Sequence, residues 1–394
     1  MSGYTYIDTP DQLAEACETM RTCSVLCVDT EFHREKTYYP EFALMQVYGG
    51  KQCWVIDPVN LDLSPLWAVI CDPAILKVFH AGRQDIEIIY AAAGKLPLPL
   101  FDTQVAAALL GMGQQIGFGN LVQRILKKTL AKQESFSDWL ARPLTAKQLE
   151  YAADDVIYLM PIYKYLKERL EARSRLAWLD EEQETLTSEA TYADNLDEVF
   201  WRVKGGNKLK GKQLAALREL AAWREKAAQE RNLPRRRMLS DEILVEIARK
   251  EKVTLEGLER IRGMSGGTVK RFGDELIACW KKGVESPADS WPKLKARALH
   301  HPGTDIRQEL LDSLVELKAV EQEIAANILA SQSDLAELAS WGHRCKGEPP
   351  KLAILHGWRY ELVGHDLLRL LKGEICLHMD VKTGLPAIAA WQQQ

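Results

Sequence analysis

The order of the predicted strands and helices is the feature that most limits the fold of this chain. Between residues 24 and 58 three short β patterns follow one another, and the pair Gly49-Gly50 predicts a hairpin turn between the second and the third. From residue 63 helical and extended patterns alternate, and beyond Thr145 the pattern is helical throughout. A β meander that passes into alternating strands and helices predicts a mixed sheet with helices packed on its faces.

The length of the chain predicts more than one hydrophobic core, because 394 residues exceed what a single core usually serves. The patterns predict an α/β domain over residues 1-173 and a linker with irregular periodicity over 174-207. Two amphipathic helical blocks follow over 208-290 and 300-380, and each is typical of a small helical bundle.

Charge and composition limit the possible partners and the location. The net charge of -4 argues against a protein that coats nucleic acid by bulk charge, although the four arginines of "RNLPRRRM" (231–238) could form a local basic surface. The eight cysteines contain no CxxC pair and are predicted to be reduced thiols. No membrane span or leader is predicted, so a cytoplasmic location is the default expectation.

Two carboxylates directly follow the apolar run "VLCV" of the first β pattern. Side chains alternate along a strand, so Asp29 and Glu31 point the same way, roughly 7 Å apart. Such a pair is costly near a core unless it is solvated, protonated, hydrogen-bonded or neutralised by a cation. Taken alone, it could also mark a strand that ends in solvent.

Further acids could complete a metal site, since two divalent cations need more than two carboxylates. Asp85 follows the strand pattern "ILKVFHA" and begins a helix, where the helix dipole alone would also favour an acid. In "LEYAADDVIYL", Tyr151 and Asp155 are four residues apart and share one helix face. A phenol and a carboxylate therefore project together from an otherwise apolar stripe.

Three motifs resemble a known family. "DTE", "HAGRQD" and "YAADD" are similar, in order and context, to the motifs of the DEDD 3'-to-5' exonucleases, in the branch whose third motif is Tyr-x-x-x-Asp. The flanks "VDTEFHREKTYYPEFALMQV" and "FDTQVAAALL" resemble ribonuclease D, while "MLSDEILVEIAR" and "LERIRGMSGGTVKRFG" resemble its HRDC domain. The resemblance implies a ribonuclease H-like exonuclease domain, a mixed sheet flanked by helices, followed by two all-α HRDC-like bundles, of which the second is divergent.

The resemblance also implies the roles of five residues. Asp29, Glu31, Asp85 and Asp155 would bind two divalent metal cations, Mg2+ or Mn2+, with Asp29 touching both. Glu31 and Asp155 would complete the ion that activates water, Asp85 would serve the other ion, and Tyr151 would orient the attacking water. Attack on the terminal phosphodiester would release a 5'-mononucleotide.

Five other residues are candidate substrate contacts. Phe32 and His33 could contact the terminal nucleotide, or be an ordinary strand-end aromatic and a solvated histidine. Gln46 could meet substrate or make a buried polar contact. Lys270 and Arg271 follow "GMSGG" at a predicted helix start, where backbone amides could meet phosphate, although the glycines could equally serve helix packing.

Three further features have structural alternatives. His80 is predicted to be a core histidine with satisfied ring nitrogens, and Asp102 is predicted to cap a helix or otherwise support the fold. The arginines between 231 and 237 could hold tRNA backbone or lie in a solvated loop.

The leading hypothesis is a metal-dependent 3'-5' exoribonuclease that trims 3'-extended precursor tRNA and other structured RNA, with no membrane association and no obligate protein partner. One alternative is a 3'-5' DNA exonuclease. The other is a catalytically inert nucleic-acid-binding scaffold, against which the complete set of acids and the tyrosine argue.

Overall fold

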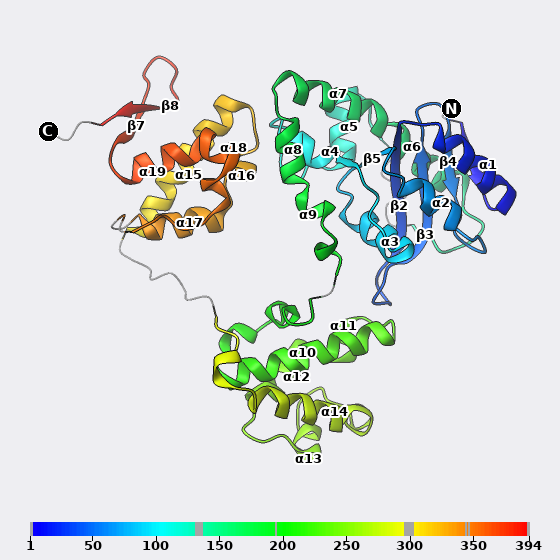
Figure 1. The fold of residues 1–394 in the computed structure, drawn as a ribbon, viewed down its shortest axis with the longest axis vertical. Coiled ribbons are helices and arrows are strands. Elements are labelled where there is room, and N and C mark those ends of the chain that lie inside the picture. The colour runs from blue at the N-terminus through cyan, green and yellow to red at the C-terminus, as the bar shows by residue number, and fades with distance from the viewer. Residues whose placement is uncertain are drawn as a thin grey trace.

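A six-stranded mixed sheet forms the centre of the N-terminal part of the molecule (Figure 1). The computed structural model describes residues 3–130, 137–193, 195–294, 303–342, 345 and 347–391. The strand order is β1-β4-β3-β2-β5-β6, with β3 antiparallel to both of its neighbours and the other pairs parallel. The predicted mixed sheet is confirmed. The strands are β1 (Tyr4–Ile7), β2 (Val25–His33), β3 (Glu41–Tyr48), β4 (Cys53–Ile56), β5 (Leu76–Phe79) and β6 (Leu100–Asp102).

Helices cover both faces of this sheet because its strands are apolar on both sides. Leu26 and Val28 of β2 pack into one buried cluster, while Cys27 packs into the other. The predicted hairpin turn at Gly49-Gly50 joins β3 to β4. The helices of this part are α1 (Pro10–Arg21), α2 (Ser64–Ile70), α3 (Arg83–Ala93), α4 (Thr103–Ala108), α5 (Phe118–Leu126), α6 (Ala146–Ile157) and α7 (Leu159–Ala172).

A helical bundle lies below the sheet domain in the view of Figure 1. It has a separate buried core, which also takes in Tyr38 from the segment between β2 and β3. Its longest helices, α10 and α14, pack against each other, and a segment of short helices leads into it from α7. The leading segment contains α8 (Leu176–Glu182), α9 (Glu184–Thr187), η1 (Glu189–Thr191), η2 (Val199–Arg202) and η3 (Gly206–Lys208). The bundle contains α10 (Lys212–Glu230), α11 (Arg235–Met238), α12 (Asp241–Arg249), α13 (Leu255–Glu259), α14 (Gly266–Val284) and η4 (Ala288–Ser290).

The C-terminal part is helical and ends in a two-stranded antiparallel sheet, which the sequence patterns did not predict. A π-helical turn, η6, precedes α19. The elements are α15 (Thr304–Gln322), α16 (Ala326–Leu329), α17 (Gln332–Trp341), η5 (Ala353–Leu355), α18 (Gly357–Arg359), η6 (Tyr360–Gly364), α19 (His365–Leu371), β7 (Ile375–Met379) and β8 (Pro386–Ala390).

This C-terminal part docks on the sheet domain and shares one buried apolar cluster with it. The Arg175 guanidinium donates hydrogen bonds to the carbonyl oxygens of Leu109 (2.8 Å) and Gln322 (2.6 Å). The Ala325 amide donates to the carbonyl oxygen of Ala108 at 3.0 Å. Main-chain and side-chain contacts thus fix the two parts to each other.

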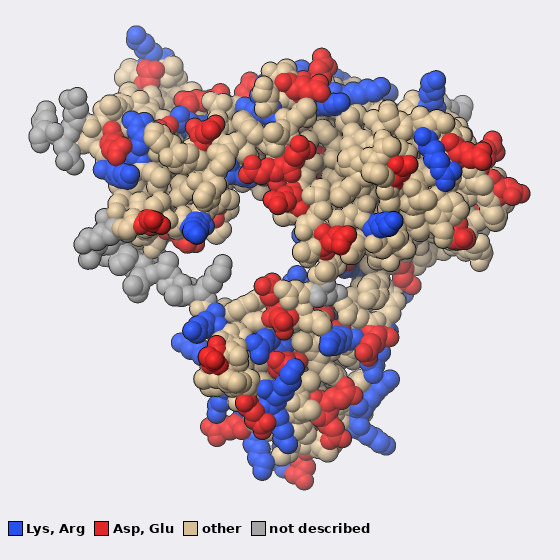
Figure 2. All heavy atoms as spheres, viewed as in Figure 1, with Lys and Arg blue, Asp and Glu red and all other residues tan. Residues whose placement is uncertain are grey.

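Charged side chains of both signs are interspersed on the surface (Figure 2), in keeping with the small net charge. Over the bundle α10–α14 the face in view carries Lys and Arg next to Asp and Glu, not one continuous basic surface. All eight cysteines are free thiols, as predicted. Among the described residues, no helix combines the length and the apolar character that crossing a membrane requires.

Candidate active site

Three carboxylates from two elements meet at the centre of the sheet. Asp29 and Glu31 lie on β2 and point to the side covered by α6, which carries Asp155. One carboxylate oxygen from each of the three lies within 4.8 Å of the others. Oxygen-only ligands at this spacing are the donor set that hard divalent cations prefer, so the residues present fit a Mg2+ or Mn2+ site.

The fourth acid lies beside this cluster and is held by the residue between the first two. Asp85 is in the first turn of α3 and is 7% exposed. The Thr30 hydroxyl donates a hydrogen bond to Asp85 Oδ1. Thr30 therefore links the helix that carries Asp85 to the strand that carries Asp29 and Glu31.

Burial raises the pKa of all four acids. For Asp29 the pKa lies well above its ordinary value, because burial is reinforced by the charges of the other three acids. Burial and the nearby Asp155 and Asp85 raise the pKa of Glu31 to about 9. Burial raises the pKa of Asp155 to about 7 and that of Asp85 to about 6. Four carboxylates this close keep their charges at neutral pH only when cations neutralise them.

Tyr151 lies next to the acids on the same helix as Asp155. Its hydroxyl hydrogen-bonds to the Asp155 carboxylate and lowers the pKa of that acid against the effect of burial. Its ring lies 6.1 Å from the ring of buried Trp139. The Trp139 amide in turn donates to His33 Nε2 at 3.3 Å. The strand that carries the first two acids thus also holds the segment that packs against Tyr151.

The turn between β5 and α3 sets the position of Asp85. Asp102 accepts hydrogen bonds from the amides of Ala81 (3.2 Å) and Gly82 (2.8 Å) in this turn. It also caps α4 by accepting from the Gln104 amide at 2.8 Å, so the predicted cap is confirmed. A Cβ on Gly82 would lie 2.5 Å from Phe79 Cβ, and the close turn therefore requires glycine.

A pocket of about 260 Å3 opens above the acids. His80 lies in its wall with both ring nitrogens in contact: Nε2 donates to the Ile116 carbonyl at 3.0 Å, and Nδ1 is 2.9 Å from Thr103 Oγ1. Burial lowers the pKa of His80, which is therefore neutral and satisfied, as predicted. The pocket is lined by Asp29, Thr30, Glu31, His80, Phe118, Tyr151, Asp155 and Leu159.

Comparison with known proteins decides the family. Residues 4–171 match the family model described as 3'-5' exonuclease, and residues 213–279 match the HRDC domain. Ribonuclease D of Acidiphilium cryptum is 41% identical over 379 residues, which cover 94% of each chain. The chain belongs to the ribonuclease D family. Ribonuclease D of Granulibacter bethesdensis is 38% identical, over 96% of this chain and 95% of that one.

A solved structure agrees with this assignment to ribonuclease D. The crystal structure of Escherichia coli RNase D, described as an exoribonuclease involved in structured RNA processing, has a TM-score of 0.80 and 35% identity over 94% of this chain and 99% of that chain. The chain is a 3'-5' exoribonuclease, and its exonuclease fold implies dependence on a divalent metal. The predicted family and fold class are confirmed; the second, divergent HRDC-like bundle and the domain limits stay predictions.

Most candidate substrate contacts of this ribonuclease D lie outside the pocket of the acids. Gln46 pairs with Asp29 across β2 and β3 but is fully buried, so the prediction of direct RNA contact needs correcting. Phe32 follows a β-bulge after Glu31, where the register of the strand pair shifts. Lys270 and Arg271 lie exposed in the first turns of α14, and Ser265 caps that helix through the Thr268 amide. This hydrogen bond spans 3.1 Å.

Sequence reasoning missed three residues that shape the site. The motif patterns assign no role to Thr30, and nothing in the spacing of Trp139 or Phe118 relates them to the motifs. The position of Thr30 inside "DTE" was the one available signal, because a hydroxyl on the opposite face of the strand can reach the neighbouring element.

Proposed function

We propose that this ribonuclease D shortens 3'-extended precursor tRNA and other structured RNA by using two divalent cations, Mg2+ or Mn2+. The observation that carries the proposal is the meeting of Asp29, Glu31 and Asp155 within 4.8 Å in an open pocket, with Asp85 beside them. Precursor tRNA is the proposed substrate because the relative in Escherichia coli is described as acting on structured RNA. A cytoplasmic location stays a prediction.

The residues have separate roles in the proposed reaction. Asp29 would contact both cations, Glu31 and Asp155 would complete one site, and Asp85 would serve the other. Two cations bound there would stabilise the attacking and leaving oxygens of an in-line displacement at phosphorus. Tyr151 already hydrogen-bonds to Asp155, so its hydroxyl lies where it can orient the attacking water. Cleavage of the terminal phosphodiester releases a 5'-mononucleotide.

A time course on a 3'-extended tRNA tests this function directly. The reaction is followed with Mg2+, with Mn2+ and with a chelator, and a DNA strand of matched sequence is run beside a single-stranded RNA. We expect stepwise shortening from the 3' end with either metal, none with chelator, and preference for RNA because a site can recognise the 2'-hydroxyl. Equal or faster cleavage of DNA would favour a DNA exonuclease, and no cleavage of either strand would favour the inert scaffold.

The role of Tyr151 makes a further prediction. In Tyr151→Phe the hydroxyl that orients water is lost while the ring still packs near Trp139, so kcat should fall by about 10- to 100-fold with little change in KM. Tyr158→Phe is the matched control, because the Tyr158 hydroxyl makes no hydrogen bond to the described residues. Single-turnover kinetics separate chemistry from product release. Equal rates for the two variants would remove Tyr151 from the reaction.

A further inference from the structure

A second cavity, of about 850 Å3, lies where the sheet domain meets the bundle α10–α14. Its walls come from α3, from the segment 34–42, which comprises the loop after β2 and the start of β3, from residues 191–193 of the linking segment, and from Arg202 and Arg235. It shares no lining residue with the pocket of the acids. Neither the metal site nor the catalytic roles described above explain this cavity.

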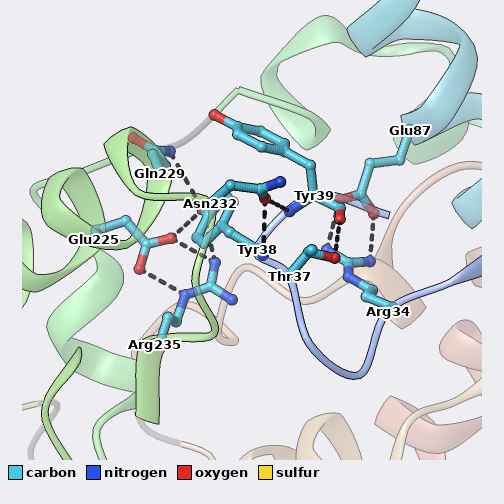
Figure 3. A network of polar contacts seen from close by, with 9 residues as sticks. All are labelled: Arg34, Thr37, Tyr38, Tyr39, Glu87, Glu225, Gln229, Asn232 and Arg235. Atoms are coloured by element: carbon cyan, nitrogen blue, oxygen red, sulfur yellow. Dashed lines mark hydrogen bonds and ion pairs between the residues drawn. The ribbon is translucent and has the colours of Figure 1, made fainter. Parts of the chain in front are cut away.

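A polar network fixes the wall contributed by the segment 34–42 (Figure 3). Asn232 Oδ1 accepts hydrogen bonds from the amides of Tyr38 (3.1 Å) and Tyr39 (3.0 Å). The Tyr38 hydroxyl donates to the Glu225 carboxylate, and Arg235 Nη2 donates to that hydroxyl at 3.0 Å. Tyr38 is 7% exposed and Glu225 is 1% exposed, so the contact that anchors this segment to the bundle is buried.

The charge of the cavity is positive. Four arginines and one carboxylate, that of Glu87, line it. The Glu87 carboxylate accepts two hydrogen bonds from Arg34, at 2.7 and 2.9 Å. Arg235 is held in the network of Figure 3. Arg83 and Arg202 are exposed, and neither forms an ion pair with any residue that the structure describes. Two guanidinium groups thus remain to bind an anion.

Aromatic rings stand beside these arginines. Tyr39 is 44% exposed, and the rings of Tyr90 and Tyr192 lie 5.9 Å apart. The helix α3 serves both sites, since Arg83 lines the cavity and Asp85, two residues later, is one of the four acids. Burial raises the pKa of Tyr192 to about 12, and the nearby Arg83 guanidinium acts in the opposite direction, which places this ring close to Arg83.

We propose that this cavity binds a single-stranded segment of the RNA substrate upstream of its 3' end, with Arg83 and Arg202 on backbone phosphates and Tyr39 stacked on a base. Guanidinium groups beside an exposed ring suit a chain of phosphates and bases better than an acidic peptide, because Asp and Glu side chains carry no aromatic ring that could stack on Tyr39. The inference rests on the proposed function, because it assigns that enzyme a path for its substrate.

The test measures binding separately from cleavage. A fluorescein-labelled single-stranded RNA of about 12 nucleotides is titrated with the full chain in chelator, at several salt concentrations. Arg202→Ala should weaken binding by about tenfold and lower the salt slope by about 0.7, as expected for one lost phosphate contact. Arg83→Ala should do the same, and Tyr39→Ala should weaken binding by about tenfold with an unchanged slope.

Matched controls come from the opposite end of the sheet. Arg21 and Lys51 are exposed. Lys51 lies just after the end of β3, and the start of β3, which adjoins the cavity, is roughly 25 Å away along the strand. Arg21→Ala and Lys51→Ala should leave both affinity and salt slope unchanged. Arg202 is the decisive position, because it is far in sequence from the acids and its loss should not disturb them.

A second readout separates this inference from the proposed function. With metal present, hydrolysis of a dinucleotide, which is too short to reach the cavity, should proceed at the wild-type rate in Arg202→Ala. If wild type hydrolyses no RNA, the proposed function fails while the binding result still stands. If Arg202→Ala and Arg83→Ala bind RNA as wild type does, the inference is overturned. Polyglutamate is also added as a competitor of the labelled RNA. If the variants bind RNA as wild type does and polyglutamate merely ceases to compete, the occupant would be an acidic protein and the inference is likewise overturned.

Discussion

Asp29→Asn should lower the rate of RNA hydrolysis by about a thousandfold, equal to about 4 kcal/mol of transition-state stabilisation. Asp29 is the acid whose pKa is raised by the charges of all three others, which lie on the same strand, on α3 and on α6. An amide keeps the shape of the side chain but removes the charge that would hold both cations. The measurement is single-turnover cleavage of a 3'-labelled RNA at saturating enzyme.

The same variant should be more stable than wild type when no metal is present. Removing one of four closely spaced, largely desolvated acids relieves the cost of holding them together, so the thermal midpoint in chelator should rise. The increase in midpoint that Mg2+ gives to wild type should shrink in the variant, because the cation loses a ligand. Glu15→Gln, an exposed change from carboxylate to amide in the middle of α1, is the control and should alter neither value. Full activity of Asp29→Asn would refute the proposed metal site.

The stability of the chelated enzyme should decrease as the pH rises from 6 to 9. The pKa of Glu31 is raised to about 9 and that of Asp155 to about 7, so the folded chain keeps protons that the unfolded chain has already lost. An acid whose pKa is raised by folding contributes stability that is fully present below the pKa of the unfolded chain, near 4. That stability is lost as the pH rises through the pKa of the folded chain. We expect a loss of about 1 kcal/mol per pH unit for each carboxyl that is protonated only in the folded chain, measured by urea titration in chelator.

Mg2+ should flatten this pH dependence, because the bound cation replaces the protons and the affinity for metal rises with pH. Groups with lowered pKa values do not obscure the result: Asp57, beside Arg142, is ionised in both states throughout this range. Glu31→Gln serves as the diagnostic variant and should lose much of the slope. A slope equal to that of wild type in Glu31→Gln would show that other groups cause the dependence.

Local patterns predicted the local parts of the fold. The alternation of side chains placed Asp29 and Glu31 on one side of β2, and the helical spacing placed Tyr151 next to Asp155. The strand β1 and the helix α1 were not predicted, although Thr9 and Gln12 form a capping box that is readable in the sequence. The position of β1 beside β4 depends on pairing between distant segments, which no local pattern contains.

Contacts between distant segments explain what remained unpredicted at the site. Thr30 and Asp85 are 55 residues apart, and their hydrogen bond requires the parallel pairing of β2 with β5. Alternation indicates that Gln46 points inward, but its pairing with Asp29 and its complete burial depend on how β2 and α6 pack against β3. The network of Tyr38 with Glu225 joins residues 187 positions apart, and no spacing rule relates them.

The apolar cluster that the C-terminal part shares with the sheet domain has a consequence for synthesis of the chain. Leu314 and Val363 pack into the same buried cluster as Leu121 and Leu166, although the bundle α10–α14 lies between them in sequence. Because a nascent chain emerges N-terminus first, the sheet domain displays this apolar surface to the cell until the residues beyond 303 have been translated. A message truncated within the bundle should therefore yield an aggregation-prone product, not a shorter enzyme.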